Sequence, residues 1–434
     1  MLSEATRLVQ EAMVAHRAGR LQEAEGHYLQ ALALEADNPD ALHLHALLLV
    51  SLGRLEQAAR QIARAIELTP GVAIFHNNHG NVLMQLDRLD EAEQQYRQAI
   101  ILDSDRIDAM NNLGVLLCRR GQHADAEIVL KRLVELVPQF SDARQNLAQL
   151  YIVTGRLAEA VDQCLNGLVT SPQNRGLRHV LGLAYGALGW VEQAVELYRK
   201  WLEEDPEDVR ARHHYSAYTG EGVAERASAA YIRMTFDHFA DGFENKLADL
   251  DYRAPSLVGE ALATALGAPQ GALRILDAGC GTGLCATFLK PYARELAGVD
   301  LSRPMLERAA VKRAYDELRQ ADLVDFLQSR PAAFDVVVSA DTLCYFGVLD
   351  GFAQAARRSL ADGGWLFFTV EAVEDEQAEP PWRLQTHGRY CHRRAYVEQT
   401  LTAAGFQAPR IESVFLRNES KKPVAGWLVS ATTC

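Results

Sequence analysis

The sequence has few cysteines, and their spacing follows no pattern. Seven cysteines occur in 434 residues, an odd number without a C-x-x-C pair. This argues against a disulfide framework and against a thiolate zinc site, and it favours a reducing compartment, for which we expect the cytoplasm. The thirteen histidines are scattered and form no H-E-x-x-H motif, so we expect no metal site.

Long apolar runs and an excess of basic charge are also absent. No run of about 18 apolar residues occurs, so we expect no membrane span. The first seven residues lack the basic and apolar pattern of a signal peptide. The formal net charge is −13, which disfavours binding to nucleic-acid phosphates. The 48% of hydrophobic residues leaves ample material for folded cores.

The first half of the sequence repeats every 34 residues, from residue 5 to residue 208, without insertion or deletion. The clearest row consists of alanines: Ala24, Ala58, Ala92, Ala126, Ala160 and Ala194. A row of small residues precedes it in each unit: Ala12, Ala46, Gly80, Gly114, Ala148 and Gly182. Two further rows hold mostly glycine and mostly proline: Gly19, Gly53, Asp87, Gly121, Gly155, Gly189 and Ala36, Pro70, Ser104, Pro138, Pro172, Pro206.

Each row has a physical reason in a unit built from two helices. Small residues let the paired helices approach closely, and glycine at a helix end accepts a left-handed backbone. Proline ends the second helix because it cannot continue the hydrogen-bond ladder. The pattern predicts an all-α solenoid of six helix pairs over residues 1–208, closed by a polar capping helix and connection over residues 209–225.

These units resemble tetratricopeptide repeats, and the resemblance implies a groove that binds a protein or a peptide. Asn78, Asn112 and Asn146 recur every 34 residues, at positions that face the groove in this family. An amide both donates and accepts, so a ladder of them could pair with an extended peptide backbone. The alternative is that these asparagines are typical of the repeat and simply solvated.

From Ala272 onward, short apolar runs alternate with helical stretches. The runs predicted to be strands are 273–277, 296–300, 334–340 and 365–370. Alternating strands and helices indicate a parallel sheet with crossover helices. Two final runs, 411–417 and 424–430, predict an antiparallel hairpin. We therefore expect a separate α/β domain over residues 226–434.

The first predicted strand ends in a glycine-rich turn that carries an acid. It reads Asp277-Ala-Gly279-Cys280-Gly281-Thr-Gly283, which differs from the G-x-G-x-x-G spacing of dinucleotide sites. Asp277 would repel a pyrophosphate and suits a cationic ligand instead. Asp300 ends the next strand, where a carboxylate can accept both hydroxyls of a ribose. Asp322, in the following region Arg-Gln-Ala-Asp322-Leu323, offers an acceptor for an adenine amino group.

Together these residues resemble the class I S-adenosylmethionine-dependent methyltransferases over roughly residues 235–434. The whole chain resembles a bacterial group of predicted methyltransferases with N-terminal tetratricopeptide repeats. The resemblance implies a Rossmann-like α/β domain with a seven-stranded sheet, the last strand antiparallel, and S-adenosylmethionine as the cofactor. The residues expected to hold the cofactor are Asp277, Gly279, Cys280, Gly281, Gly283, Asp300, Leu301, Met305, Asp322 and Leu323.

Methyl transfer needs alignment of the reacting atoms more than proton transfer. If a base is used, the candidates are His392, Tyr390 and Asp341, because the loops after the fourth and fifth strands lie beside the transferred methyl group. Asp341 could instead cap a helix, and Tyr390 could only pack. Three aromatic residues, Phe236, Phe239 and Phe243, could cover the cofactor or pack on the sheet.

The sequence thus predicts a cytoplasmic methyltransferase whose repeat groove recruits a protein or peptide acceptor. It binds no nucleic acid and no membrane in this interpretation. The fourth strand lacks the Asn/Asp-Pro-Pro-aromatic motif of base- and amide-methylating relatives, which disfavours DNA or a glutamine nitrogen as the acceptor. Two alternatives stay open. One is a small-molecule methyltransferase whose repeats serve assembly, and the other is an interaction scaffold that binds the cofactor without turnover.

Overall fold

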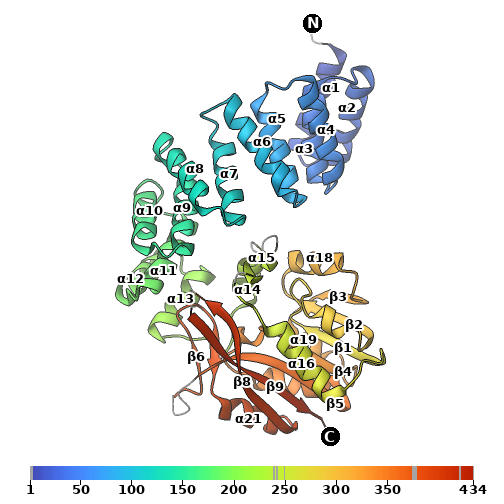
Figure 1. Ribbon diagram of the computed structural model, residues 1–434, viewed down its shortest axis with the longest axis vertical. Helices are drawn as coiled ribbons and strands as arrows, with labels where there is room; N and C mark the ends of the chain where they lie inside the picture. Colours follow the sequence, from blue (N-terminus) through green and yellow to red (C-terminus); the bar gives the residue numbers. More distant parts are fainter. Residues whose placement is uncertain are drawn as a thin grey trace. The chain divides into compact units, whose positions relative to one another are not determined.

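The computed structural model describes residues 3–237, 240, 243–248, 250–373, 379–419 and 422–433 (Figure 1). The chain divides into two compact units, Met1–Leu188 and Gly189–Cys434. None of the helices in the described ranges is both long and apolar enough to cross a membrane.

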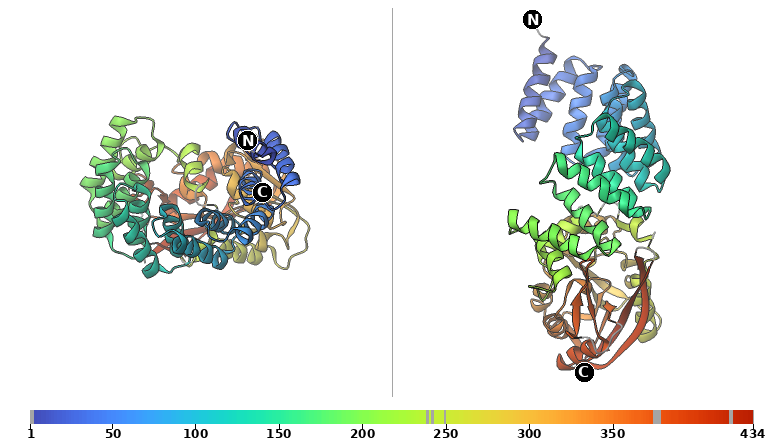
Figure 2. Two further views of the ribbon diagram at one scale, coloured as in Figure 1. Left: turned by 90° about the horizontal axis from the view of Figure 1, so that it is seen from above. Right: turned by 90° about the vertical axis from the view of Figure 1, so that its left-hand side faces the viewer.

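The first unit is a stack of antiparallel helix pairs, which Figure 2 shows from two further sides. The predicted all-α repeat fold is confirmed for this half of the chain. Its helices are α1 (Glu4–Arg17), α2 (Leu21–Leu34), α3 (Pro39–Ser51), α4 (Leu55–Leu68), α5 (Ala73–Gln85), α6 (Leu89–Leu102), α7 (Ile107–Arg119), α8 (His123–Leu136), α9 (Ser141–Val153), α10 (Leu157–Thr170) and α11 (Arg175–Leu188).

The residues that repeat every 34 positions lie where their size and backbone conformation are needed. Every alanine of the clearest row is fully buried. The glycines between paired helices have positive φ angles, and Asp87 adopts the same left-handed conformation with a φ of 59°. Asn38 caps α3 by accepting a hydrogen bond from the backbone N–H of Ala41 at 3.0 Å.

Gly80 shows how tightly the two helices of a unit approach each other. A Cβ atom added to this glycine of α5 would lie 2.5 Å from Cε1 of Tyr96 on α6. Tyr96 is buried, and its hydroxyl donates a 2.8 Å hydrogen bond to Asn81 Oδ1. The ring therefore has little room to move away from a larger side chain at position 80.

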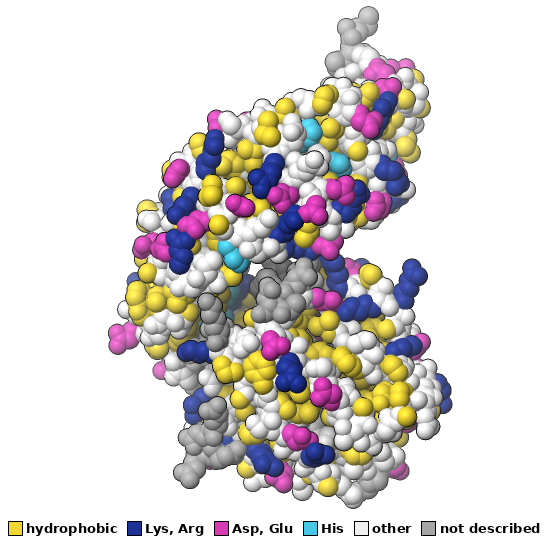
Figure 3. All heavy atoms as spheres, viewed as in Figure 1, with side chains coloured by type: hydrophobic (Ala, Val, Ile, Leu, Met, Phe, Trp, Pro, Cys, Tyr) yellow, Lys and Arg dark blue, Asp and Glu magenta, His cyan; other side chains and the backbone are white. Residues whose placement is uncertain are grey.

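Charges of both signs are mixed on the first unit, as the face shown in Figure 3 illustrates. Many of them belong to exposed pairs such as Arg88 with Glu91, at 2.7 Å, and Arg97 with Glu93, at 2.7 Å. Such pairs contribute little to stability each, about 0–1 kcal/mol. The face seen there offers no strongly charged field of one sign to a partner.

The second unit contains a mixed α/β domain, which confirms the predicted fold class. Its strands are β1 (Leu273–Ala278), β2 (Ala293–Asp300), β3 (Glu317–Gln320), β4 (Phe334–Ser339), β5 (Leu360–Ala372), β6 (Trp382–Leu384), β7 (Tyr390–His392), β8 (Gln407–Glu419) and β9 (Lys422–Thr432). Its helices are α12 (Val191–Glu204), α13 (Val209–Thr219), α14 (Ala229–Asp237), α15 (Phe243–Ala248), α16 (Ala254–Leu266), α17 (Ala286–Leu289), α18 (Arg303–Val311), α19 (Leu323–Gln328), α20 (Asp350–Ser359) and α21 (Arg394–Ala403), with the 3-10 turn η2 (Leu343–Tyr345).

The strand order is β3-β2-β1-β4-β5, all parallel, with β9 antiparallel to β5 and β8 antiparallel to β9. Six of these seven strands coincide with runs that the sequence predicts, including the terminal hairpin, and the seventh, β3, has no counterpart among those runs. Two short strands, β6 and β7, were not predicted. They extend the sheet where the last residues of β5, Glu371 and Ala372, pair with Cys391 and His392.

Helices α12 and α13 belong to the second unit. A ring nitrogen of His213 on α13 lies 2.8 Å from the carbonyl oxygen of Gly388, and Tyr231 of α14 stacks on the same ring with centroids 4.0 Å apart. The Tyr390 hydroxyl donates to the Ala224 carbonyl at 2.9 Å. The connection expected over residues 209–225 is therefore built into the α/β unit.

A matched pair of alanine substitutions tests the packing of the first unit. We expect Gly80→Ala to lower its free energy of unfolding by about 1–3 kcal/mol, because the new methyl group overlaps the Tyr96 ring. Gly26→Ala places a methyl group on α2 with nothing within 4 Å, so it should raise stability by about 0.5–1 kcal/mol through helix propensity.

Circular dichroism of the full chain can follow this unit separately. All five tryptophans lie in the second unit, so a loss of helix without a change in tryptophan fluorescence reports on the first: Trp190, Trp201, Trp365, Trp382 and Trp427. Equal stability of Gly80→Ala and the unaltered chain would contradict the close helix contact.

Candidate functional site

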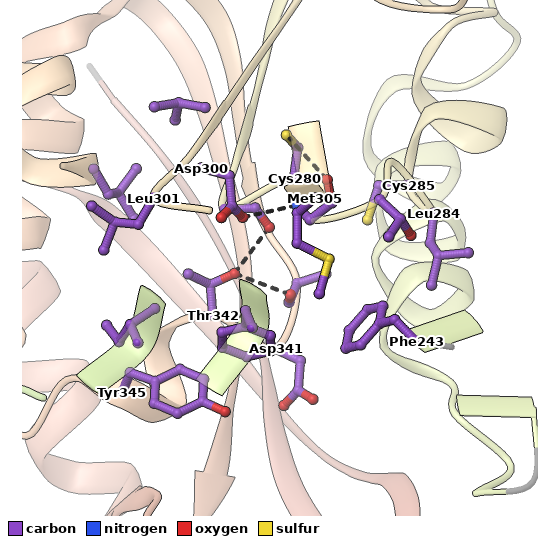
Figure 4. Close-up of a pocket in the computed structure, with 18 of the residues that line it drawn as sticks. Phe243, Cys280, Leu284, Cys285, Asp300, Leu301, Met305, Asp341, Thr342 and Tyr345 are labelled. Carbon is purple, nitrogen blue, oxygen red and sulfur yellow. Dashed lines mark hydrogen bonds between the residues drawn. The ribbon is translucent and has the colours of Figure 1, made fainter. Parts of the chain in front are cut away.

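A cavity of about 360 Å³ lies at the carboxyl ends of the parallel strands, where open α/β sheets bind ligands. Figure 4 shows part of its lining. The lining residues that follow β1, β2, β3 and β4 include Gly279, Cys280, Gly281, Asp300, Leu301, Asp322, Leu323, Asp341 and Thr342. Met305 on α18 also lines it. Eight of the ten residues expected to hold a cofactor are thus brought together.

The glycine turn after β1 approaches its neighbours too closely for any side chain at position 279. A Cβ atom on Gly279 would lie 2.2 Å from Oγ1 of Thr342, and its φ is 79°. The backbone N–H groups of Gly279 and Cys280 both donate to the carbonyl of Val299, at 2.8 and 3.0 Å. The turn is therefore fixed against the end of β2, and its backbone faces the cavity.

Asp300 ends β2 with a half-buried carboxylate at the cavity. Oδ2 accepts from the N–H of Gly281 at 2.9 Å, and Oδ1 accepts from the N–H of Ser302 at 2.8 Å. Burial raises the pKa of this carboxyl, and the two backbone donors oppose the shift. Each oxygen keeps a second lone pair, so two neighbouring hydroxyl groups can be accepted from the cavity.

Asp277 and Gly283, the other two expected cofactor residues, are not among the lining residues of the described chain. Asp277 is 1% exposed, and Tyr315 donates a 2.6 Å hydrogen bond to its Oδ2. Burial raises the pKa of Asp277 to about 7. A Cβ atom on Gly283 would lie 2.9 Å from the Tyr315 ring. Both residues therefore stabilise the turn without lining the cavity.

Asp322 forms an ion pair with an arginine that the sequence analysis did not single out. Nη1 of Arg226 lies 3.0 and 3.2 Å from its two carboxylate oxygens, and the guanidinium stands 5.7 Å from the centre of the Phe346 ring. Oδ1 of Asp322 also accepts from the N–H of Val324, which caps α19. The connection before α14 thus supplies one wall of the cavity.

Two of the three candidate bases lie away from the cavity. His392 is fully buried, its Nε2 is 3.1 Å from the Gly347 carbonyl oxygen, and burial lowers its pKa to about 4. Tyr390 is fully buried, with its hydroxyl bonded to the connection. Neither is among the lining residues in the described part of the chain. The reason is β7, which pairs with β5 and turns both side chains into the interior.

Asp341 is the one candidate base that reaches the cavity. Arg417 Nη1 donates to both of its carboxylate oxygens, at 2.8 and 2.9 Å. Burial raises the pKa of Asp341, while Arg417 opposes the shift. Its φ is 53°, a conformation that few residues other than glycine adopt. Its side chain does not cap the following turn η2.

Arg417 belongs to a buried charge network that the sequence analysis missed. Its guanidinium bonds Glu371 on β5, and Arg389 bonds both Glu371, at 2.8 Å, and Glu419. Burial opposes ionisation of Glu371, but the two arginines outweigh it and hold the pKa below its usual range. Charged residues inside apolar strands, such as Arg417 in Val-Phe-Leu-Arg, were the available signal.

Aromatic rings close another wall of the cavity. The rings of Phe236 and Tyr345 meet edge to face with centroids 5.5 Å apart, and those of Phe236 and Phe243 with centroids 6.0 Å apart. All three residues line the cavity. Phe239, the third residue of the expected aromatic run, lies outside the described residues.

The charges at the cavity disfavour a ligand with a pyrophosphate. Its three lining arginines, Arg226, Arg389 and Arg417, are each paired with carboxylates, so no described lining cation is free for a pyrophosphate. Asp300 is held only by backbone N–H groups. The site therefore suits a ligand with a vicinal diol and a positive charge. Among the described residues, no three His, Cys, Asp or Glu side chains are arranged to hold a metal ion.

The expected asparagine ladder of the first unit is cross-linked between repeats. Asn112 donates to Asn77 Oδ1 at 3.1 Å and to Asn81 Oδ1 at 2.8 Å, and Asn146 donates to Asn111 Oδ1 at 2.8 Å. The amide of Asn78 lies 2.8 Å from Nε2 of His43: its partner is thus also in a neighbouring repeat. All three ladder residues are half-buried, and the carbonyl oxygens of Asn112 and Asn146 accept no hydrogen bond that the described residues show.

Models of known families match both halves of the chain. A methyltransferase-domain model matches residues 249–409. Models of the tetratricopeptide repeat match residues 9–73, 43–107, 77–139, 111–175 and 176–208.

Individual relatives match part of the chain. Methyltransferase-like protein 27 of Homo sapiens is 35% identical over 138 residues, 31% of this chain and 54% of that protein. Malonyl-[acyl-carrier protein] O-methyltransferase of Enterobacter lignolyticus is 34% identical over 111 residues, 25% of this chain and 44% of that protein. The chain spans about half the length of these relatives. Among solved structures, that of PilW, a type IV pilus biogenesis factor, has a TM-score of 0.45 and 22% identity, over 49% of this chain and 98% of that one.

Because the pKa of Asp277 is raised in the folded chain, the stability of the fold should depend on pH. Replacing this carboxyl with an amide should remove that dependence. Between the unfolded-state pKa near 3.8 and the folded-state value of about 7, the folded chain binds more protons, so stability falls as pH rises. We expect the free energy of unfolding to fall less for Asp277→Asn than for the unaltered chain as the pH rises from about 5 to about 8. Denaturant unfolding followed by tryptophan fluorescence measures this, and exposed Asp362→Asn is the control. Parallel pH profiles for Asp277→Asn and the unaltered chain would contradict it.

Proposed function

Since the chain combines tetratricopeptide repeats with a methyltransferase domain, we propose that it transfers a methyl group from S-adenosylmethionine to a protein or peptide that the repeats recruit. The observation that carries the cofactor assignment is Asp300. It places two acceptor positions beside a glycine turn whose cavity has no free cation among the described lining residues.

In this proposal different residues bind different parts of the cofactor. Asp300 accepts the two ribose hydroxyls, Leu301 and Met305 cover the adenine, and Asp322 with Leu323 lies at its edge. S-adenosylmethionine supplies a methyl group already activated for transfer. The protein has to align it with the acceptor atom, which can lower the barrier by about 7–11 kcal/mol. Asp341 is the lining carboxylate available to take a proton.

The repeats support a protein or peptide acceptor. The side-chain carbonyl oxygens of Asn112 and Asn146 can accept backbone N–H groups from an extended chain. The relatives favour a second candidate, a small-molecule acceptor, because one of them is named as a ubiquinone biosynthesis O-methyltransferase. Under that candidate the repeats serve assembly.

Asp300→Ala tests the cofactor assignment. We expect the variant to fold and its affinity for S-adenosylhomocysteine to fall by about ten- to a few-hundredfold, since hydrogen bonds to a charged group contribute roughly 1.5–3 kcal/mol each. Calorimetric titration measures this, with Asp362→Ala, an exposed aspartate of the same unit, as the control. A folded variant with unchanged affinity would show that Asp300 does not hold the cofactor.

Replacing Asn78, Asn112 and Asn146 together with alanine tests the role of the groove. We expect the KM for a protein acceptor to rise while kcat and cofactor affinity stay unchanged, because only uniform binding is lost. The fold should survive, since stacking between repeats stabilises it. Exposed Asn166→Ala on α10 is the control.

The matching experiment uses a chain of residues 189–434, which forms one compact unit. A small-molecule acceptor should be methylated equally well by this shorter chain and by the full chain. If the triple variant and the shorter chain both match the full chain on a protein acceptor in kcat and KM, the groove has no part in acceptor choice.

A further inference from the structure

One end of the cavity carries more negative than positive charge. Three carboxylates and two guanidiniums make up the network there, in which Arg417 and Glu371 are buried and Glu419 is 34% exposed: Asp341, Glu371, Glu419, Arg389 and Arg417. His387 is the neighbouring titratable group, 3.5 Å from Glu371, and burial lowers its pKa, so it is neutral near pH 7. The network therefore carries one net negative charge.

The charges at the other end are already matched in the proposed complex. Arg226 and Asp322 form a neutral pair, which leaves Asp300 as the carboxylate without an ion pair among the described residues that line the cavity beside the glycine turn. S-adenosylmethionine carries a sulfonium, an ammonium and a carboxylate, and so one net positive charge, which Asp300 balances. The negative charge of the Arg417 network is left for a second ligand.

Aromatic rings surround the same end of the cavity. Phe236, Phe243 and Tyr345 form the edge-to-face group described above, and the Asp341 carboxylate lies between the Tyr345 and Phe243 side chains in the view of Figure 4. The face of an aromatic ring attracts a cation, by about 0.5–1 kcal/mol at exposed sites and about 2 kcal/mol or more where water is excluded. Rings beside an unbalanced carboxylate are a combination that suits an alkylammonium group.

We propose that the methyl acceptor is an amine that enters this end of the cavity as an alkylammonium, a proposal that rests on the function given above. Carboxylate acceptors would add a second negative charge to the network and are disfavoured. Alcohols would leave its charge unbalanced. A lysine side chain or an amino terminus of a recruited protein has the required chemistry.

The transfer step balances with Asp341 as the proton acceptor. One ammonium proton passes to the Asp341 carboxylate, and burial, which raises the pKa of this carboxyl, favours that transfer. The freed nitrogen lone pair forms a bond to the methyl carbon. The carbon–sulfur bond breaks, its electron pair remains on the sulfur of the neutral thioether product, and the positive charge moves to the methylated nitrogen.

Three small probes of equal length test the charge preference. Hexylamine, hexanol and hexanoate are titrated by calorimetry into the full chain saturated with S-adenosylhomocysteine. We expect hexylammonium to bind at least about tenfold more tightly than either of the others. Equal binding of the three, or no binding of hexylamine, overturns the amine proposal. Failure of S-adenosylhomocysteine itself to bind overturns the proposed function instead.

Glu419→Gln makes the network neutral and gives the matched test. It should lower hexylammonium affinity about tenfold and leave hexanol and S-adenosylhomocysteine binding unchanged. Glu412→Gln removes an exposed carboxylate from the same strand, β8, and is the control. If Glu419→Gln fails to fold, Asp341→Asn removes the same charge. A variant that binds all three probes like the unaltered chain overturns the proposal.

Methyl-labelled S-adenosylmethionine adds a chemical readout to the same probes. The label should appear in N-methylhexylamine, which is stable to alkali. Label recovered instead in a methyl ester of hexanoate, which alkali releases as methanol, overturns the amine proposal while leaving methyl transfer intact.

Discussion

The cavity depends on one buried guanidinium, that of Arg417. Its side chain is 2% exposed and joins β8 to Glu371 on β5 and to Asp341 in the loop after β4. Removing one partner of such a buried pair costs about 3–5 kcal/mol, because the other charge is left without compensation. The terminal hairpin is therefore held against the central strands at the place where Asp341 lines the cavity.

Helix α14 links the last repeat helix to the cofactor end of the same unit. Tyr231, in its first turn, stacks on His213 of α13. Asp237, at its end, accepts a 2.6 Å hydrogen bond from Ser302, which follows directly on the Asp300 and Leu301 wall. Ile232 and Phe236 between them line the cavity. Helix α13 is thus part of the second unit, and cutting the chain at residue 226 would remove contacts that position α14.

Local patterns in the sequence were enough for the repeats, for four of the five parallel strands from β1 to β5, and for finding eight residues that line the cavity. Gly279, Gly281 and Asp300 follow strands at short spacing, so their neighbourhood is encoded within about 25 residues of sequence. The network of Arg417, Asp341 and Glu371 was missed because it depends on pairing between strands far apart in the chain. His392 and Tyr390 were chosen as candidate bases without knowledge of β7, and the pairing of that strand turns them into the interior.

The central proposal is that the cavity of the second unit binds an adenosyl cofactor with a net positive charge. Calorimetric titration of the full chain with S-adenosylmethionine and, separately, with NAD tests this most directly. We expect S-adenosylmethionine to bind with one molecule per chain and NAD to show no binding, because the lining arginines are already paired. Binding of NAD without binding of S-adenosylmethionine would contradict the account.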